Sequence, residues 1–154
     1  MPHRLLDNYF EDMEVGQSER SRGRTITETD IVNWCMFTGD WFPIHSDMVY
    51  SEESMFGARL APGLMVLSIA GGLVVPADSQ AILAQYGVDR IRYPVPTLIG
   101  DTISVENSIA SLEDRDATSG VVELNWDVHN QNDTIICNVR IRVLQAKRPA
   151  GRKA

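Results

Sequence analysis

The chain has 154 residues, of which 44% are hydrophobic and 23% charged, and its formal net charge at pH 7 is −7. A chain of this length is typical of one soluble domain whose core needs no disulfide or metal to stabilise it. The negative charge repels phosphate backbones, so nucleic acid is not expected as a partner.

The cysteines and the apolar segments indicate the compartment. Cys35 and Cys137 are the only two cysteines, and both fall at apolar positions of predicted elements, so we expect buried free thiols. The first 17 residues contain no apolar stretch of signal-peptide length. The longest apolar run, residues 60–76, is interrupted by Pro62 and three glycines and is too short to cross a bilayer. These features predict a soluble, cytoplasmic protein without a membrane partner.

Residues 1–24 lack hydrophobic periodicity and are expected to be irregular. A helix follows, because Thr27 and Asp30 have the spacing of a capping box and Gly39 stands where a helix C-cap is favoured. Residues 40–47 are then expected to form a loop that leaves this helix. The positions with helical spacing are Ile31, Trp34, Cys35 and Thr38.

Two further helices are predicted. A short one covers Met48 to Met55, and a second covers Leu64 to Val75, between Pro62 and Pro76. The second helix is apolar on all of its faces, and Ser68 is its only polar side chain. A helix of this kind is expected to be buried on every side.

The rest of the chain alternates between apolar and polar residues in segments 101–111, 120–130 and 134–144, which is typical of strands with one buried face. Residues 89–96 are a further strand, placed at an edge by their prolines. An antiparallel sheet wrapped around one buried helix is an α+β fold. We expect a single domain over residues 1–145 and a basic, disordered tail over residues 146–154.

The loop after the first helix carries Asp40 and His45. A carboxylate and an imidazole that share one water form a general acid/base pair, and histidine is the side chain most easily tuned to work near neutral pH. Taken alone, the pair is more typical of an ordinary turn, where aspartate is common. The helix that starts after Pro62 adds to the case, because the Gly63 N–H is free and open to a ligand oxygen, as in an oxyanion hole.

The stretch "TGDWFPIHSDMVYSEESMFGARLAPGLMVLS" resembles the signature of MaoC-like dehydratases, the family of (R)-specific enoyl-CoA hydratases with a hotdog fold. That pattern reads S/T-G-D-x-N-P-x-H-x-D, then A-x-x-x-x-F-G-x-x-I-A-H-G-M. The later stretch "DRIRYPVPTLIGDTI" resembles the family's R-F-x-x-P-V-x-x-G-D-T-L. The first pattern is matched at Thr38, Gly39, Asp40, Pro43, His45, Asp47, Phe56, Gly57, Ala61 and Gly63.

This resemblance implies a homodimer, or a dimer of dimers, that acts on an acyl-CoA thioester. It implies that Asp40 and His45 activate a water that adds to C3 of a trans-2-enoyl-CoA, and that the Gly63 N–H holds the thioester oxygen. The reverse reaction is dehydration of a 3-hydroxyacyl-CoA at the same site. The resemblance implies no metal and no redox cofactor.

The chain departs from the pattern at two positions: the Asn of D-x-N-P is Phe42, and the His of A-H-G is Pro62. Both changes alter the expected wall of the substrate pocket. Trp41 is assigned to the same wall with Phe42, although packing of the loop is an equally good interpretation of the two aromatic residues. Arg59 is a candidate contact for the CoA phosphates, although a solvated or structural role is the more common one for a single arginine.

Two other functions stay open. A hotdog thioesterase is one, although such enzymes often place an acidic residue on the buried helix, and residues 64–75 contain none. The other is an acyl-CoA-binding subunit without chemistry, which the departures at Phe42 and Pro62 allow. The acyl group is also open between aliphatic, branched, dicarboxylic and aromatic types.

Overall fold

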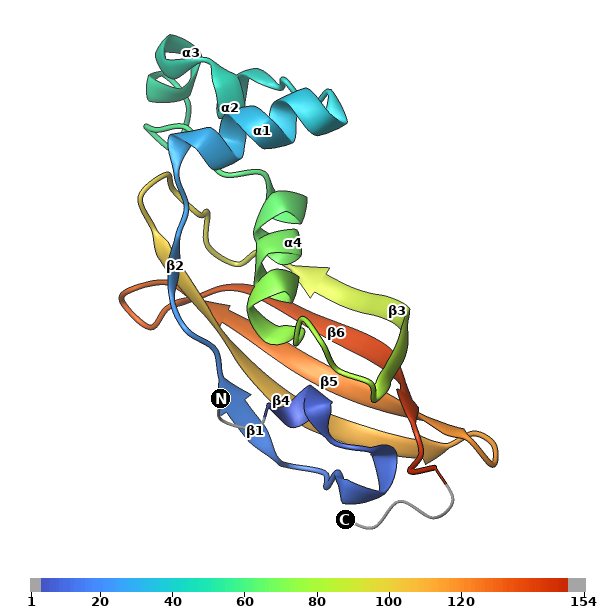
Figure 1. Cartoon of the computed structure of the whole chain (residues 1–154). Helices are drawn as coiled ribbons and strands as arrows, with labels where there is room; N and C mark the ends of the chain where they lie inside the picture. The colour runs from blue at the N-terminus through green and yellow to red at the C-terminus, as the bar shows by residue number, and fades with distance from the viewer. Residues whose placement is uncertain (1–3, 150–154) are drawn as a thin grey trace.

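The computed structural model describes residues 4–149, and its centre is one antiparallel sheet that lies along a helix (Figure 1). The order of the strands is β1–β4–β5–β6–β3, and β2 also pairs with β4. This is the predicted α+β arrangement. The strands are β1 (Ser18–Arg20), β2 (Arg24–Thr25), β3 (Ile82–Arg92), β4 (Thr102–Asp114), β5 (Ser119–His129) and β6 (Ile135–Ala146).

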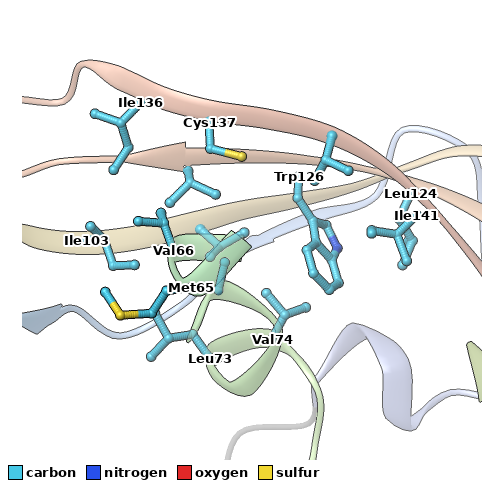
Figure 2. Packing of buried hydrophobic residues seen from close by; sticks show 14 of the residues in the cluster. Met65, Val66, Leu73, Val74, Ile103, Leu124, Trp126, Ile136, Cys137 and Ile141 are labelled. Atoms are coloured by element: carbon cyan, nitrogen blue, oxygen red, sulfur yellow. The ribbon is translucent and has the colours of Figure 1, made fainter. Parts of the chain in front are cut away.

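The core lies between the inner face of the sheet and α4 (Gly63–Val74), as Figure 2 shows. The alternation predicted for β4, β5 and β6 is confirmed, because their apolar positions point toward α4. Each fully buried aliphatic side chain contributes roughly 1.5–3 kcal/mol, so this layer is the main support of the fold. The side chains drawn from α4 are Met65, Val66, Leu73 and Val74, and those from the sheet include Ile103, Leu124, Trp126, Ile136, Cys137 and Ile141.

The helix α1 (Glu28–Thr38) has the predicted ends. The Asp30 amide donates to the Thr27 hydroxyl at 3.3 Å, and the Thr27 amide donates to the Asp30 carboxylate at 2.8 Å, which completes a capping box. Gly39 ends the helix with φ of 77°, a left-handed conformation that glycine adopts without strain. These caps fix the point at which the chain enters the loop with Asp40.

The predicted loop over residues 40–47 is in part a one-turn helix, α2 (Pro43–Ser46). Pro43 occupies its first position, where the fixed φ of proline favours helix and its missing N–H costs nothing. The next helix, α3 (Met48–Glu52), is shorter than the predicted 48–55, and the Asp47 carboxylate caps it by accepting from the Tyr50 amide at 3.0 Å. Figure 1 shows α1, α2 and α3 gathered beyond the N-terminal end of α4.

The prediction that the apolar helix is buried on every side is wrong for this chain. Leu64 is 59% exposed, and Ser68 and Gly72 on the same stripe of α4 are also exposed. The physical reason is that the sheet covers one side of the helix and no other element of residues 4–149 covers the opposite side. None of the helices in this range is long and apolar enough to cross a membrane.

The bounds of three strands also differ from the sequence expectations. Residues 18–20, expected to be irregular, form β1 because they pair with β4. The strand β3 begins at Ile82 rather than at residue 89, and it ends at Arg92, before the prolines. Within residues 4–149 it pairs only with β6, so the predicted edge position is confirmed. β6 runs to Ala146, and residues 150–154 of the predicted disordered tail lie outside the described residues.

Candidate active site

His45 lies on α2 with its imidazole mostly buried, and its orientation is set by the main chain. Its Nδ1 is 2.7 Å from the carbonyl oxygen of Leu60. A carbonyl oxygen accepts hydrogen bonds and cannot donate them, so Nδ1 carries the hydrogen in this contact. In the neutral imidazole, Nε2 is then an acceptor with a free lone pair.

Asp40 faces this lone pair. Its Oδ2 lies 4.0 Å from His45 Nε2, and its side chain is 45% exposed against 14% for the histidine. An ionised carboxylate and an unprotonated Nε2 are both acceptors, so a group with two donors satisfies both. Water is such a group, and two acceptors that each lie about 2.8 Å from one water oxygen stand roughly 4–4.6 Å apart. The observed separation therefore matches a water held between the two side chains.

The acceptor of the His45 hydrogen bond is itself held in place. Leu60 forms an isolated antiparallel bridge with Leu98, and the next amide, Ala61 N–H, donates to the Thr97 carbonyl at 2.8 Å. The Leu98 amide donates to the buried carboxylate of Asp101 at 2.8 Å. The carboxylate thus fixes the strand-like segment 97–98, and this segment fixes the carbonyl that orients His45.

A pocket of about 340 Å³ opens beside His45 and is lined mainly by apolar groups. Its wall includes Gly63, the first residue of α4. The first hydrogen bond inside α4 runs from the Val66 amide to the Pro62 carbonyl, so the amides of residues 63–65 precede it and have no partner within residues 4–149. The lining residues are His45, Phe56, Leu60, Ala61, Gly63, Tyr93, Pro94, Val95, Pro96 and Thr97.

The structure brings only some of the predicted site residues to this pocket. His45 and Gly63 line it. Asp40 is not a lining residue, but its carboxylate lies 4.0 Å from the imidazole of His45. Trp41 and Phe42 are more than half exposed and are not among the lining residues, although the Phe42 ring meets the His45 ring edge-on at 6.2 Å. Pro62 is buried at the start of α4.

Arg59, the candidate for the CoA phosphates, is engaged elsewhere in this structure. Its Nη1 donates to Glu28 Oε1 at 2.9 Å, and its Nη2 also contacts the Glu28 carboxylate. These hydrogen bonds raise the pKa of Arg59 and lower that of Glu28. The pair ties the segment before α4 to α1, and a phosphate contact by Arg59 would need this pair to open.

Sequence reasoning missed two parts of the pocket. One is the Leu60 carbonyl, which no side-chain pattern reveals because a main-chain group makes the contact. The other is Tyr93, which stands directly after β3 and reaches the pocket from a distant part of the chain. The signal for Tyr93 was the second family-like stretch, in which it occupies the position of the pattern's Phe.

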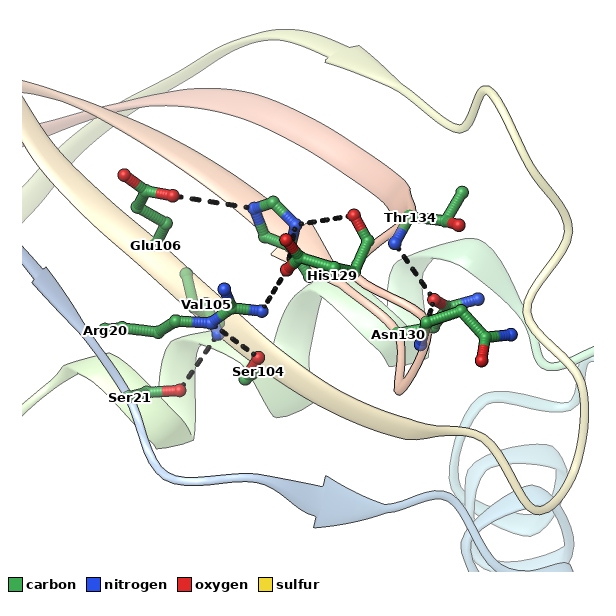
Figure 3. Close-up of polar contacts among 10 residues, drawn as sticks. Arg20, Ser21, Ser104, Val105, Glu106, His129, Asn130 and Thr134 are labelled. Atoms are coloured by element: carbon green, nitrogen blue, oxygen red, sulfur yellow. Dashed lines mark hydrogen bonds and ion pairs between the residues drawn. The ribbon is translucent and has the colours of Figure 1, made fainter.

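Another cluster of ionisable groups surrounds His129 (Figure 3), and none of the residues labelled there lines the pocket. Its Nδ1 lies 3.2 Å from the Asp133 carboxylate and its Nε2 lies 3.8 Å from Glu106, while Arg20 donates to Asp133 at 2.6 Å. These contacts join β1, β4 and the β5–β6 hairpin, which is a structural role. Between residues 4 and 149, no group of three or more His, Cys, Asp and Glu side chains could hold a metal ion.

The two cysteines are buried and free, as predicted. Burial raises the pKa of the Cys137 thiol to about 11. Burial, and then the Asp40 carboxylate, also raise the pKa of Cys35. Both side chains therefore stay neutral near pH 7 and pack as small apolar groups.

Comparison with known proteins adds a family match to this geometry. The family model described as "MaoC like domain" matches residues 12–131. The chain is 41% identical over 97 residues to the protein named MaoC of Klebsiella aerogenes, covering 63% of this chain and 29% of that protein. It is 32% identical over 107 residues to the 3-hydroxybutyryl-CoA dehydratase of Methylorubrum extorquens, covering 68% of this chain and 65% of that one.

A third relative is the (R)-specific enoyl-CoA hydratase of Rhodospirillum rubrum, 30% identical over 111 residues, covering 70% of this chain and 74% of the relative. The chain thus spans less than two thirds of the length of the first two relatives.

Solved structures share the fold. A structure titled as a monoamine oxidase regulatory protein of Archaeoglobus has a TM-score of 0.87 at 34% identity, covering 92% of this chain and 96% of that one. A double-hotdog protein of Mycobacterium tuberculosis has a TM-score of 0.83 at 16% identity, covering 99% of this chain and 48% of the other. The second likeness shows that the sheet and α4 form a hotdog fold.

Proposed function

Since the chain belongs to the MaoC-like domain family, we propose that it catalyses the reversible hydration of a trans-2-enoyl-CoA to a 3-hydroxyacyl-CoA. Two relatives carry names of this reaction class, a 3-hydroxybutyryl-CoA dehydratase and an (R)-specific enoyl-CoA hydratase. The observation that carries the proposal is the 4.0 Å separation of two acceptors, Asp40 Oδ2 and His45 Nε2, at the mouth of an apolar pocket.

The two acceptors bind and activate the water. Its oxygen attacks C3, the π electrons of the C2–C3 bond move toward the carbonyl, and one proton of the water passes to the acid/base pair. C2 then takes up a proton from the pair, so that one water is consumed and no other reactant is needed. Proton transfer of this kind by positioned side chains accelerates reactions by about 10²–10⁴-fold.

The start of α4 stabilises the negative charge that develops on the thioester oxygen. The Gly63 amide is a free donor at a helix N-terminus, where the helix dipole also favours negative charge. A donor fixed before the reaction costs no reorganisation in the transition state. The acyl group would lie against Phe56, Val95 and the other apolar residues of the pocket wall.

The test is the loss of enoyl-thioester absorbance when the purified protein is added to a panel of trans-2-enoyl-CoA substrates. The panel includes short aliphatic, branched, dicarboxylic and aromatic acyl groups, because the acyl preference is open. We expect turnover of at least one apolar member, since the pocket wall is mainly apolar. No turnover of any member would contradict the proposed function.

A thioesterase is the alternative within enzymes. Its mechanism needs a nucleophile or base near the thioester carbon, but α4 carries no acidic or basic side chain. Release of free CoA, followed with a disulfide reagent, separates the two activities. Free CoA that appears as fast as the substrate disappears would favour the thioesterase.

A binding protein without chemistry is the alternative outside enzymes, and the departures at Phe42 and Pro62 support it. It predicts tight binding of acyl-CoA with no change in the bound thioester. The same panel tests it, because binding measured by calorimetry without any loss of absorbance would favour this function.

We also propose that the working form is a homodimer, or a dimer of dimers. The edge strand β3 pairs on one side only and exposes Leu83 and Tyr86, and the uncovered stripe of α4 exposes Leu64. An unpaired edge with apolar side chains is a surface that a second chain can cover. Closed twofold symmetry is the commonest solution for such surfaces.

A further inference from the structure

Tyr93 and Thr97 are polar residues of the pocket wall that the proposed mechanism does not use, and Tyr93 is the more exposed of the two. It directly follows β3 and begins segment 93–97, which lines the pocket together with the first residue of α4. A Cβ built on Gly63 would lie 2.8 Å from Tyr93 Cζ, 2.9 Å from Cε2 and 3.1 Å from Cε1. The Tyr93 ring therefore packs against the first residue of α4 at the ring carbon that bears the hydroxyl.

The Tyr93 hydroxyl has no hydrogen-bond partner within residues 4–149, and the residue as a whole is 41% exposed. Burial raises the pKa of Tyr93 to about 12, with a smaller contribution from Cys137. The phenol thus stays protonated throughout the neutral range and remains a donor. The Tyr93 hydroxyl and the Gly63 amide are thus two unused donors of residues that line one pocket.

The hydroxyl is a feature of this chain rather than of the family pattern. In R-F-x-x-P-V-x-x-G-D-T-L, the Phe position corresponds to Tyr93 when Arg92, Pro96 and Asp101 are aligned with the pattern. The same chain has lost the pattern's polar Asn and His, at Phe42 and Pro62.

We propose that the Tyr93 hydroxyl donates a hydrogen bond to the thioester oxygen of the substrate, alongside the Gly63 amide. This inference rests on the proposed hydration reaction. As water adds to C3, the electron pair of the C2–C3 bond shifts and the carbonyl oxygen gains negative charge. Two donors then share that charge, and the Tyr93 proton stays on its oxygen throughout.

The test is Tyr93→Phe, which removes the hydroxyl and keeps the ring that packs on Gly63. Removal of one oxyanion donor lowers kcat by about 10²–10³-fold in other enzymes. We expect kcat to fall at least tenfold with KM within threefold of the parent value, since the bond strengthens as charge develops. The matched control is Tyr9→Phe, on the N-terminal segment next to Arg148, which should leave both constants unchanged.

Two further measurements separate this role from a structural one. The melting temperature of Tyr93→Phe and its affinity for a saturated acyl-CoA should equal those of the parent, because packing and ground-state binding are kept. The shape of the kcat profile from about pH 6 to 9 should also be kept, since a phenol with a pKa near 12 does not titrate there.

Several results would overturn the assignment. One is a kcat of Tyr93→Phe within tenfold of the parent value, and another is an effect on KM alone. A third is the loss of one limb of the pH profile, which would make Tyr93 a proton-transfer group. If Tyr93→Phe melts earlier, kcat is measured below its transition, and the same tenfold criterion applies. A parent protein without turnover contradicts the hydration reaction itself, whereas an active parent with an active Tyr93→Phe contradicts only the role of Tyr93.

Discussion

At the residue scale, the proposed reactive centre consists of two acceptors that face each other. The Leu60 carbonyl holds the hydrogen of His45 on Nδ1, so Nε2 faces Asp40 as a lone pair. Asp40→Asn replaces one acceptor with an amide group. The amide N–H can donate to His45 Nε2 and so displace the water between the two side chains. His45→Gln removes the imidazole. We expect either change to lower kcat by about 10²–10⁴-fold and to leave substrate affinity nearly unchanged.

The double variant should be scarcely slower than the poorer single variant, because groups that act on one water are not additive. Turnover and melting temperature are measured for all three proteins. Asp47→Asn is the matched control, since Asp47 caps α3 and asparagine caps equally well. Folded single variants that keep most of their turnover would remove Asp40 and His45 from the mechanism.

The residues of this centre differ in how far the sequence could reveal them. The proximity of Asp40 and His45 was predictable because they are close in the chain, on a family-like motif that follows a capped helix. The Leu60 carbonyl and Tyr93 were not, because they meet the others only through long-range contacts. The motif placed Trp41 and Phe42 beside the proposed pair in the sequence, but it could not predict that both side chains are exposed and do not line the pocket.

At the element scale, α4 and segment 93–97 are in contact at one glycine. A Cβ on Gly63 would come within 2.8 Å of the Tyr93 ring, closer than atoms in contact approach. Gly63→Ala therefore requires the Tyr93 ring to move, and we expect it to destabilise the fold by about 1 kcal/mol, the low end of the cost of overpacking, because Tyr93 is 41% exposed. Thermal or denaturant unfolding measures this change.

Gly71→Ala in the same helix is the control. Its Cβ would meet the Trp126 ring at 3.8 Å, an ordinary contact, and alanine favours helix over glycine by about 0.5–1 kcal/mol. The two identical substitutions should thus have opposite signs. In the Tyr93→Ala background the penalty at Gly63 should disappear, and a penalty that persists there would contradict the contact with the ring.

The elements themselves were largely predictable, and the exceptions share a cause. Caps and alternation are local, so α1, β4, β5 and β6 were found close to their observed ends. β1 and the first half of β3 exist because they pair with distant strands, and their short or irregular sequences carry little local signal. The apolar pattern of α4 predicted a burial that this single chain does not provide.

At the scale of the whole molecule, the exposed apolar surface of α4 and of β3 is the reason to expect that chains assemble. Val88 on β3 pairs with the buried Ile141 and faces the same side of the sheet, yet it is 39% exposed because no strand of residues 4–149 lies beyond this edge. If a second chain covers this edge, the sedimentation mass at micromolar concentration should be about twice or four times the 17.2 kDa of one chain.

A charge that points inward on an edge strand prevents pairing with another chain, so Val88→Lys should weaken the assembly and shift the mass toward that of one chain. Val15→Lys is the control, because Val15 is 63% exposed on the turn before β1, away from β3, and the same charge there should leave the mass unchanged. A parent protein that sediments as a single chain at this concentration would contradict the dimer. An assembly that Val88→Lys leaves intact would place the interface away from the edge of β3.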